Sequence, residues 1–493
     1  MHYISTRDKN IRLTSCEAIK RGISADGGLF WPESFPGVSH DDLVNLAGKD
    51  YRTRAKFILG KFLSDFTAEE IDNCVENAYT AEKFGSNDIA PLHKLNDNAY
   101  VLELWHGPTC AFKDMALQIL PHFLTTSMRK TNEEKQAVIL VATSGDTGKA
   151  ALEGFCDVEN TNVIVFFPSE GVSEVQRKQM VTQGGKNTFV TAVTGNFDDC
   201  QTGVKKIFAN NDLRDELFDG GFVFSSANSI NWGRLVPQVV YYFSAYCDML
   251  KSGDITVGEK VNFVVPTGNF GDILAGYVAK LMGLPVNRLI CASNKNNILT
   301  DFINSGEYDV NRTFYTTMSP SMDILVSSNL ERLLFALSGN DDQLIASYMA
   351  DLAAKGKYTV KKEILSDLQA QFAAGYTDEQ ATLATIKKYF EEYGYVVDPH
   401  TAVALNVYEQ NLSECKSVIL STASPYKFPA SVCKAIDAKA DTTDEWKLFE
   451  TVKNLSGLAV PASLADLKEK NVRFSGVCAA SEMSDQIRKF LKI

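Results

Sequence analysis

Short apolar runs, separated by turns and by stretches with helical periodicity, dominate the chain from residue 137 onward. They are rich in Val and Ile and do not alternate strictly between apolar and polar residues. Such runs are typical of parallel strands covered by helices on both faces, so the pattern predicts an α/β architecture. The predicted strands cover residues 137–142, 162–167, 188–193, 261–265, 288–292 and 417–420.

The first 90 residues show a different pattern, with helical periodicity around residues 51–63 and 67–84 after a glycine-rich turn at residues 26–28. Thr67 and Glu70 have the spacing of a capping box, in which a hydroxyl and a carboxylate accept hydrogen bonds from free N–H groups at a helix start. We therefore expect a helix to begin there, within a mainly helical region.

The change of pattern along the chain predicts three domains. We expect a helical cap at residues 1–90, a first doubly wound α/β domain at 91–215 and a second at 216–493. Residues 304–394 are rich in helical patterns and are expected to form an insertion in the second domain. A chain of 493 residues exceeds the size at which one core stops growing, so a cleft between domains is expected.

Composition and charge restrict the class of function. The apolar fraction of 45% and the charged fraction of 22% are ordinary for a folded globular protein. The formal net charge of −12 disfavours binding to nucleic acid or to an anionic membrane, although a local basic pocket can still hold a small phosphate. The expected partner is a small-molecule substrate.

Ten cysteines are spread singly from Cys16 to Cys478, without a Cys-x-x-Cys pair. This spacing favours reduced thiols over a disulfide framework and offers no zinc site, so no metal is expected. The N-terminal residues lack the apolar core of a signal peptide, and no run approaches the roughly 20 apolar residues of a membrane span. These features predict a cytoplasmic protein.

The first segment with candidate chemistry is His-Gly-Pro-Thr-Cys-Ala-Phe-Lys-Asp at residues 106–114. Lys113 follows a Gly-Pro turn and stands at the entrance to an apolar helix. A lysine near a helix start is commonly a solvated charge. A lysine that forms a Schiff base needs instead an apolar, partly dry pocket that favours its neutral amine, and Phe112, Met115 and Leu117 can supply one.

A second segment, Thr-Ser-Gly-Asp-Thr-Gly at residues 143–148, joins a predicted strand to a predicted helix. Free N–H groups at such a helix start attract an anion, so a substrate carboxylate can sit on residues 144–147. An ordinary βα turn explains the same pattern. The segment is not a nucleotide-binding P-loop, because Thr143 stands where the first glycine is required and Ala150 follows Lys149.

A third segment, Pro-Thr-Gly-Asn-Phe-Gly-Asp at residues 266–272, carries a stronger phosphate signal. Glycines let the backbone approach a ligand closely, so the N–H groups of residues 268–271 and the dipole of the following helix are expected to hold a phosphate. The absence of G-x-G-x-x-G argues against a dinucleotide. A fourth segment, residues 417–428, ends a predicted strand with hydroxyl residues. Ligands lie beyond the carboxyl ends of strands, so these turns are expected to converge.

Taken together, these segments resemble the threonine synthase family within the fold type II pyridoxal-phosphate enzymes. The motifs at residues 106–114, 143–148, 267–272 and 421–428 occur in the order of that family, and similarity begins at residues 3–7 and 26–29. The chain resembles the bacterial and fungal branch. The resemblance implies two α/β domains of the fold type II kind and a carbon–oxygen lyase of threonine biosynthesis. That enzyme converts O-phospho-L-homoserine and water to L-threonine and phosphate with pyridoxal 5′-phosphate as cofactor.

The resemblance also implies roles for individual residues. Lys113 would carry the cofactor as a Schiff base and act as the catalytic base, and Thr422 would meet the pyridine nitrogen. Asp146 would lie near the phenolic oxygen of the cofactor, where related enzymes often carry Asn. The cofactor phosphate would be held by Gly268, Asn269, Phe270 and Gly271, and the substrate carboxylate by Ser144, Gly145 and Thr147.

Basic and amide residues elsewhere can receive the substrate phosphate, namely Lys149, Asn228, Asn231 and Arg234. Each can equally be a surface charge or a cap of the backbone. The chain departs from the family pattern at Ser424, where a His is expected, and at Tyr426, where a small residue is expected. These departures question the role of that loop toward the substrate phosphate.

Two other functions are compatible with these motifs. One is another lyase of the same cofactor class, such as a threonine-synthase-like phospho-lyase or a hydroxyamino-acid dehydratase, since fold and cofactor alone do not fix a substrate. The other is a non-catalytic metabolite-binding relative. Mere binding does not require a Schiff-base lysine, so Lys113 argues against the latter. The sequence is compatible with a monomer or a homodimer.

Overall fold

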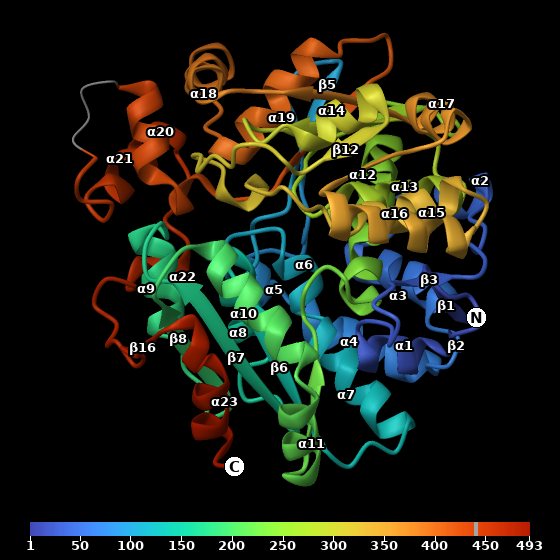
Figure 1. Ribbon diagram of the computed structural model, residues 1–493. Helices are drawn as coiled ribbons and strands as arrows, with labels where there is room; N and C mark the ends of the chain where they lie inside the picture. The colour runs from blue at the N-terminus through green and yellow to red at the C-terminus, as the bar shows by residue number, and fades with distance from the viewer. Residues whose placement is uncertain (438–441) are drawn as a thin grey trace.

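The computed structural model describes residues 1–437 and 442–493. Two β-sheets with helices on their faces form most of the molecule, and a smaller N-terminal region lies beside them (Figure 1). The predicted α/β class is confirmed, and each of the six predicted strands is present.

The N-terminal region combines helices with a small antiparallel sheet of order β2-β1-β3. The pattern of the sequence does not predict this sheet, because strands of two or three residues give no periodic signal. Its strands are β1 (Tyr3–Ser5), β2 (Arg12–Leu13) and β3 (Phe30–Pro32). Its helices are α1 (Ser15–Arg21), α2 (His40–Ala47), α3 (Tyr51–Phe62), α4 (Ala68–Ala78) and α5 (Ala81–Phe84).

The capping box at Thr67 is confirmed. Thr67 accepts a hydrogen bond from the N–H of Glu70 over 3.1 Å, and the N–H of Thr67 donates to the Glu70 carboxylate over 2.8 Å. The helical pattern of residues 67–84 is nevertheless split into α4 and α5. The split arises because the Thr80 side chain starts a new helix by accepting a hydrogen bond from the N–H of Lys83.

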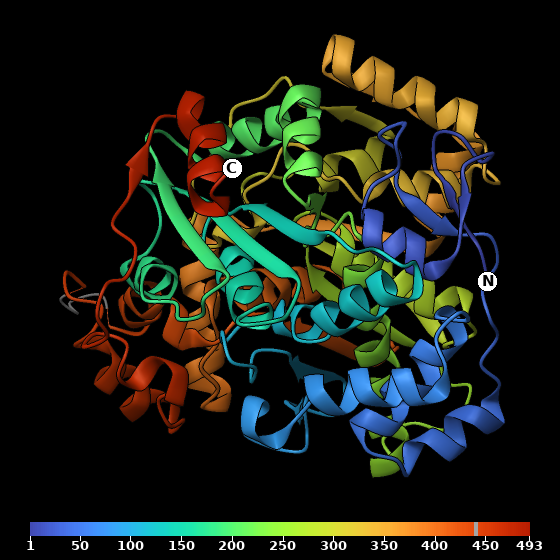
Figure 2. The ribbon, with the colours of Figure 1, turned by 90° about the horizontal axis from the view of Figure 1, so that it is seen from below.

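The first large sheet is parallel throughout, with the order β16-β8-β7-β6-β9. Figure 2 shows the C-terminal strand and helix of the chain, in red, against its edge. The strands are β6 (Gln136–Ala142), β7 (Thr161–Pro168), β8 (Thr188–Val193), β9 (Phe222–Ser225) and β16 (Val477–Cys478). The helices of this part are α6 (Asp114–Leu117), α7 (Leu120–Lys130), α8 (Asp146–Gly154), α9 (Glu174–Val181), α10 (Phe197–Ala209), α11 (Asn211–Asp219), η3 (Ala480–Glu482) and α23 (Met483–Leu491).

The second large sheet has the order β14-β11-β10-β15-β5-β4 and is parallel except for β4, which runs antiparallel to β5. Its strands are β4 (Leu92–Lys94), β5 (Ala99–Glu103), β10 (Val261–Pro266), β11 (Val286–Ser293), β14 (Phe372–Tyr376) and β15 (Ser417–Ser421). The helices of this part are α12 (Trp232–Ser252), α13 (Gly271–Leu281), α14 (Ile298–Ser305), α17 (Lys362–Gln371), α18 (Glu379–Tyr393) and α19 (Pro399–Gln410).

Sheet membership does not follow the expected boundaries at residues 91 and 215. β5 lies in the range expected for the first α/β domain, but it pairs with β15 of the second sheet. β9 lies beyond residue 215 and pairs with β6 of the first sheet, which β16 completes from the far end of the chain. An apolar run shows that a strand exists, whereas long-range packing decides which strand it joins.

Residues 304–394 are rich in helices, as expected. They contain α15 (Leu330–Leu337), α16 (Asp342–Lys355), η1 (Pro320–Met322) and a short antiparallel pair, β12 (Glu307–Asp309) and β13 (Lys357–Thr359). They also supply the edge strand β14, which the pattern does not predict because Phe-Ala-Ala-Gly-Tyr has no β-branched residue. After β15 the chain adds η2 (Pro425–Lys427), α20 (Pro429–Ile436), α21 (Leu448–Ser456) and α22 (Ala462–Ala465).

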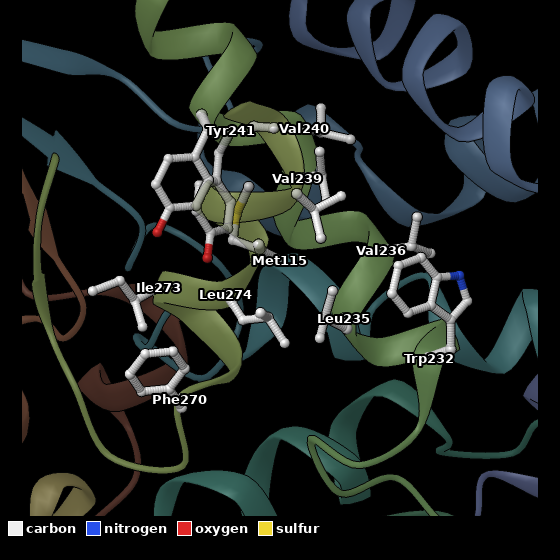
Figure 3. Close-up of a cluster of buried hydrophobic side chains, with 14 of the residues drawn as sticks. Met115, Trp232, Leu235, Val236, Val239, Val240, Tyr241, Phe270, Ile273 and Leu274 are labelled. Carbon is white, nitrogen blue, oxygen red and sulfur yellow. The ribbon is translucent and has the colours of Figure 1, made fainter. Parts of the chain in front are cut away.

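Helix α12 lies in the main hydrophobic core and packs against α3, α6 and α13. Figure 3 shows Leu235 and Tyr241 of α12 together with Met115 of α6 and Ile273 of α13. Met115 follows Lys113 by two residues, and Ile273 belongs to the first turn of α13. This core therefore fixes the segment that carries Lys113 and the start of α13 in place. Although α12 has 21 residues, no helix in the described ranges is long and apolar enough to cross a membrane.

Candidate active site

The turns that follow strands of both sheets surround a cavity of about 1000 Å³. Residues after β6, β9, β10 and β15 line it, so the predicted convergence of these turns is confirmed. The N-terminal region contributes Arg7, Arg21 and residues of the loop before β3 to the same wall. The cavity therefore lies between all three parts of the molecule.

Lys113 lies at the start of α6 and lines this cavity. Its side chain is 9% exposed, and its Nζ lies 4.9 Å from the centre of the Phe112 ring. Burial lowers the pKa of Lys113 to about 8 and outweighs the opposing effect of Asp146, and the nearby cations Arg234 and Lys427 add to the lowering. The dry, apolar setting that a reactive amine needs is therefore present.

Local hydrogen bonds hold the turn before Lys113. Asp114 accepts hydrogen bonds from the N–H and the hydroxyl of Thr109, each over 2.8 Å. A Cβ at Gly107 would lie 2.5 Å from the Asp114 side chain, so only glycine allows this close approach. Burial raises the pKa of Asp114 to about 6, although the bonds from Thr109 oppose that shift. Asp114 is thus a structural anchor for the lysine that precedes it.

Asp146, the first residue of α8, is buried against Lys113 and Lys427. Its Oδ2 lies 3.6 Å from Lys113 Nζ and its Oδ1 lies 2.5 Å from Lys427 Nζ. Burial favours the neutral carboxyl, but the charges of Lys427 and Lys113 outweigh it and hold the pKa of Asp146 well below its usual range. Asp146 is therefore ionised.

The loop of residues 268–271 connects β10 to α13 and lines the cavity. Its carbonyl groups are tied down, because Ser327 Oγ donates to Gly268 O over 2.8 Å and Asn329 donates to Asn269 O. Phe270 has a φ of +61°, a left-handed conformation. No acceptor among the described residues binds the N–H groups of this loop. Free donors at the N-terminus of a helix suit a phosphate.

The loop of residues 144–147 is a second set of backbone donors at the same cavity. Ser144, Asp146 and Thr147 line it. The N–H of Gly145 instead donates to Thr143 Oγ1 over 2.9 Å, and its φ is +142°. Gly145 therefore shapes the turn rather than offering its own N–H to a ligand.

Thr422 follows β15 and lines the cavity with an exposed fraction of 5%. No described residue forms a hydrogen bond with its hydroxyl, whereas its carbonyl oxygen accepts a hydrogen bond from the N–H of Phe112 over 2.8 Å. This backbone hydrogen bond holds Thr422 next to the segment that carries Lys113, and the Thr422 hydroxyl is available to a ligand.

The four residues considered for a substrate phosphate separate into two pairs. Asn228 and Arg234 line the cavity, and burial lowers the pKa of Arg234 to about 10. Lys149 instead forms an ion pair with Glu153 over 2.7 Å and a short hydrogen bond with Gln183. Asn231 caps α12 and donates to the carbonyl oxygens of Ile19 and Ser226. Lys149 and Asn231 are not among the cavity-lining residues, and their polar atoms have partners in the protein, so their ligand role stays a prediction without support from this geometry.

The two departures in the loop after β15 do not reach the cavity lining. Ser424 caps η2 by accepting a hydrogen bond from the N–H of Tyr426 over 3.3 Å. The Tyr426 hydroxyl donates to Leu458 O over 2.7 Å, and its ring packs against Phe449. Ser424 therefore caps η2, and Tyr426 packs toward the C-terminal helices.

Several cavity residues carry no signal in the local sequence. Ser321 of η1 donates a hydrogen bond to Asp146 Oδ2 over 3.0 Å and accepts one from Lys113 Nζ over 3.2 Å. His400 accepts a hydrogen bond from the N–H of Ser321 over 3.2 Å and is held by Asp398 over 2.6 Å. The start of α19, Asp398-Pro399-His400, has the form of a helix cap, which predicts where the helix begins but not that His400 reaches the cavity.

These residues fit pyridoxal phosphate, the cofactor implied by the resemblance. Lys113 offers an amine of lowered pKa, residues 268–271 offer unpaired N–H groups for a phosphate, and Thr422 offers an unpaired hydroxyl. All three line one cavity. The donor set therefore matches an aldehyde with a phosphate and a ring nitrogen.

Family models cover nearly the whole chain. Residues 2–79 match the model described as threonine synthase N terminus. Residues 86–422 match the model of the pyridoxal-phosphate dependent enzyme, and residues 401–489 match threonine synthase, C-terminal.

Individual relatives agree with these models. Threonine synthase of Pseudomonas aeruginosa is 39% identical over 480 residues, which cover 96% of this chain and 95% of that protein. Threonine synthase-like 1 of Pongo abelii is 42% identical over 434 residues, or 86% of this chain, but the chain spans only 58% of that relative's length. The crystal structure of pyridoxal-phosphate-bound threonine synthase from Brucella melitensis superposes with a TM-score of 0.88 at 37% identity and covers 100% of both chains.

Proposed function

Because this chain belongs to the threonine synthase family of pyridoxal-phosphate-dependent enzymes, we propose that it converts O-phospho-L-homoserine and water into L-threonine and phosphate. The observation that carries the proposal is the placement of Lys113, the loop of residues 268–271 and Thr422 around one cavity. The relatives that carry the name threonine synthase match this chain over almost its whole length.

The cofactor has a defined set of holding residues in this proposal. Lys113 binds it covalently through Nζ, the N–H groups of Gly268, Asn269, Phe270 and Gly271 hold its phosphate, and Thr422 donates to its ring nitrogen. Asp146 lies beside the ring oxygen. The free donors of the loop and the free hydroxyl of Thr422 support these assignments.

The substrate has two anionic ends, and the cavity has cationic or N–H groups for each. The N–H groups of Ser144 and Thr147 at the start of α8 receive the carboxylate, and Asn228 and Arg234 receive the phosphate. Arg234 keeps its charge at neutral pH even with a pKa of about 10. This arrangement holds the carbon chain between two fixed ends.

Proton transfer falls to Lys113. When bound, the cofactor withdraws electrons from the substrate carbons near the amino group, which makes their protons easier to remove. Lys113 Nζ, freed when the substrate amine takes its place, accepts the proton from the α-carbon and returns protons later in the reaction. Loss of a proton from the β-carbon lets phosphate leave the γ-carbon, after which the γ-carbon gains a proton and water adds at the β-carbon. Close placement of Nζ lowers the entropic part of each barrier.

A second candidate is a phospho-lyase that releases phosphate without adding water to the β-carbon and in which water instead releases the amino group as ammonium. The 42% identity with threonine synthase-like 1 favours considering it. Its products from the same substrate would be phosphate, ammonium and a 2-oxo acid.

One assay separates these candidates. The purified protein, loaded with pyridoxal phosphate, is incubated with O-phospho-L-homoserine, and threonine, 2-oxo acid and inorganic phosphate are measured together. Threonine and phosphate in equal amounts support the proposal. Phosphate with 2-oxo acid in place of threonine supports the phospho-lyase, and the absence of all three products refutes both.

A further inference from the structure

Lys427 is a fully buried cation whose charge is balanced by Asp146. Its Nζ lies 2.5 Å from Asp146 Oδ1 and donates a hydrogen bond to Thr109 O over 3.1 Å. Gln176 Nε2 donates to the same carboxylate oxygen over 2.9 Å. A buried ammonium is stable only beside an anion, so this contact holds one positive and one negative charge together out of water.

The other oxygen of Asp146 faces Lys113. It lies 3.6 Å from Lys113 Nζ, and the hydroxyl of Ser321 bridges the two groups. A carboxylate this close to a buried amine favours the ammonium form. With Lys427 already present, however, protonation of Lys113 places two cations against the single carboxylate of Asp146. The geometry thus sets Lys427 and Lys113 in competition for one negative charge.

We propose that Lys427 is a positioning residue that balances the charge of Asp146 and thereby leaves Lys113 as the free amine with which an aldehyde cofactor reacts. The proposal rests on the proposed function for the identity of that cofactor. It explains how a carboxylate can stand where related enzymes often carry Asn: Asp146 and Lys427 together are a neutral hydrogen-bonding unit. Lys427 itself does not belong to the cavity lining.

Four further titratable side chains interact with this arrangement from neighbouring elements. Arg234 of α12 and Asp272 of α13 interact electrostatically with Lys113, and His400 of α19 interacts electrostatically with Asp146. Asp114 of α6 interacts electrostatically with Lys427. All four side chains stay in place in the variants below.

The test uses the whole chain without cofactor and the variants Lys427→Met, Asp146→Asn and the double variant. Pyridoxal phosphate is added at a series of pH values, and the rate of gain in visible absorbance is recorded. Borohydride reduction and peptide mass spectrometry identify Lys113 as the modified residue. The measured quantity is the pH at which the rate reaches half its maximum. Lys149→Met, which removes a lysine paired outside the cavity lining, serves as control.

The expected order of midpoints is specific. Lys427→Met should raise the midpoint by about one pH unit or more, because Asp146 then pairs with Lys113 alone. Asp146→Asn should lower it, since Lys113 loses its anion and keeps a neighbouring cation. The double variant should return to within about half a unit of the unmodified protein, because both charges are gone. Lys149→Met should leave it unchanged.

Equal midpoints in Lys427→Met and the unmodified protein would overturn the proposal. If Lys427→Met does not fold, the comparison is made between Asp146→Asn and the double variant, in which both charges are removed. Equal midpoints of cofactor capture in those two variants also overturn the proposal. Threonine formation is not needed for the readout. A protein that captures the cofactor on Lys113 but makes no threonine refutes the proposed function alone, whereas no capture on Lys113 refutes both.

Discussion

The N–H of Phe112 donates a hydrogen bond to the carbonyl oxygen of Thr422 over 2.8 Å, and Ala111 and Ala423 form a β-bridge beside it. Two segments from distant parts of the chain are held side by side by this contact. Lys113 and Thr422 consequently open onto the same cavity, which is why one cofactor can meet both.

Replacing Lys113 by Ala should remove the visible absorbance of the bound cofactor and lower threonine formation by at least about a thousandfold, because both the covalent link and the catalytic base are lost. The fold should persist, since the change removes a buried amine. Absorbance spectra, product assays and thermal unfolding of the same sample check these outcomes. Threonine formation at a near-normal rate would mean that another lysine carries the chemistry.

Cofactor capture by the cofactor-free protein should increase with pH around a midpoint of about 8, the lowered pKa of buried Lys113. The same shift affects stability. Between pH 8 and the ordinary lysine value of 10.5, the unfolded chain binds more protons at this residue than the folded one, so its contribution to the free energy of unfolding rises with pH. Denaturant titrations of the protein and of Lys113→Ala across this interval measure that difference. A capture midpoint near 10.5 would contradict the prediction.

Gly268→Ala should weaken cofactor affinity more than Gly271→Ala. A Cβ at Gly268 would lie 2.5 Å from Ser321 O, which forces the loop to move, whereas at Gly271 the nearest atom, Ser229 Cβ, is 3.3 Å away. We expect a loss of about tenfold, or about 1.4 kcal/mol, at Gly268 and a smaller loss at Gly271. Titration with pyridoxal phosphate and with phosphate-free pyridoxal tests this. Unchanged affinity in both variants would remove the phosphate from this loop.

Arg234→Gln should raise the KM for O-phospho-L-homoserine by about tenfold or more and leave the cofactor spectrum in place, because a charged hydrogen bond to the substrate phosphate is lost. Lys149→Met is the matched control, since its ammonium is paired with Glu153 outside the cavity lining. Steady-state kinetics of both variants decide. An unchanged KM in Arg234→Gln, or an equal rise in both, would contradict the assignment.

Thr422→Asp should change the visible spectrum of the bound cofactor and slow threonine formation. A hydroxyl can donate to an unprotonated ring nitrogen, whereas a carboxylate favours the protonated ring and a stronger electron sink. Thr422→Ser keeps the hydroxyl and should have a mild effect. Spectra and rates of the two variants are compared directly. If the Asp variant behaves like the Ser variant, residue 422 does not face the ring nitrogen.

The sequence by itself determined the local elements and the donors they carry. The six apolar runs became strands, and the turns after residues 142 and 265 became helix starts with free N–H groups. These features are local, because strand periodicity, glycine at a turn and a capping residue act over a few neighbouring positions. The apolar neighbours of Lys113 likewise stand beside it in the sequence.

The tertiary structure alone decided which of these groups act together. It brought Lys427 to Asp146 and Ser321 to Lys113, and it placed Gln183 beside Lys149 and Ile19 beside Asn231. No local pattern contains these contacts, because strand pairing joins segments that are hundreds of residues apart. The charge state of a buried side chain depends on its spatial neighbours and on its exclusion from water, and both exist only after the chain has packed.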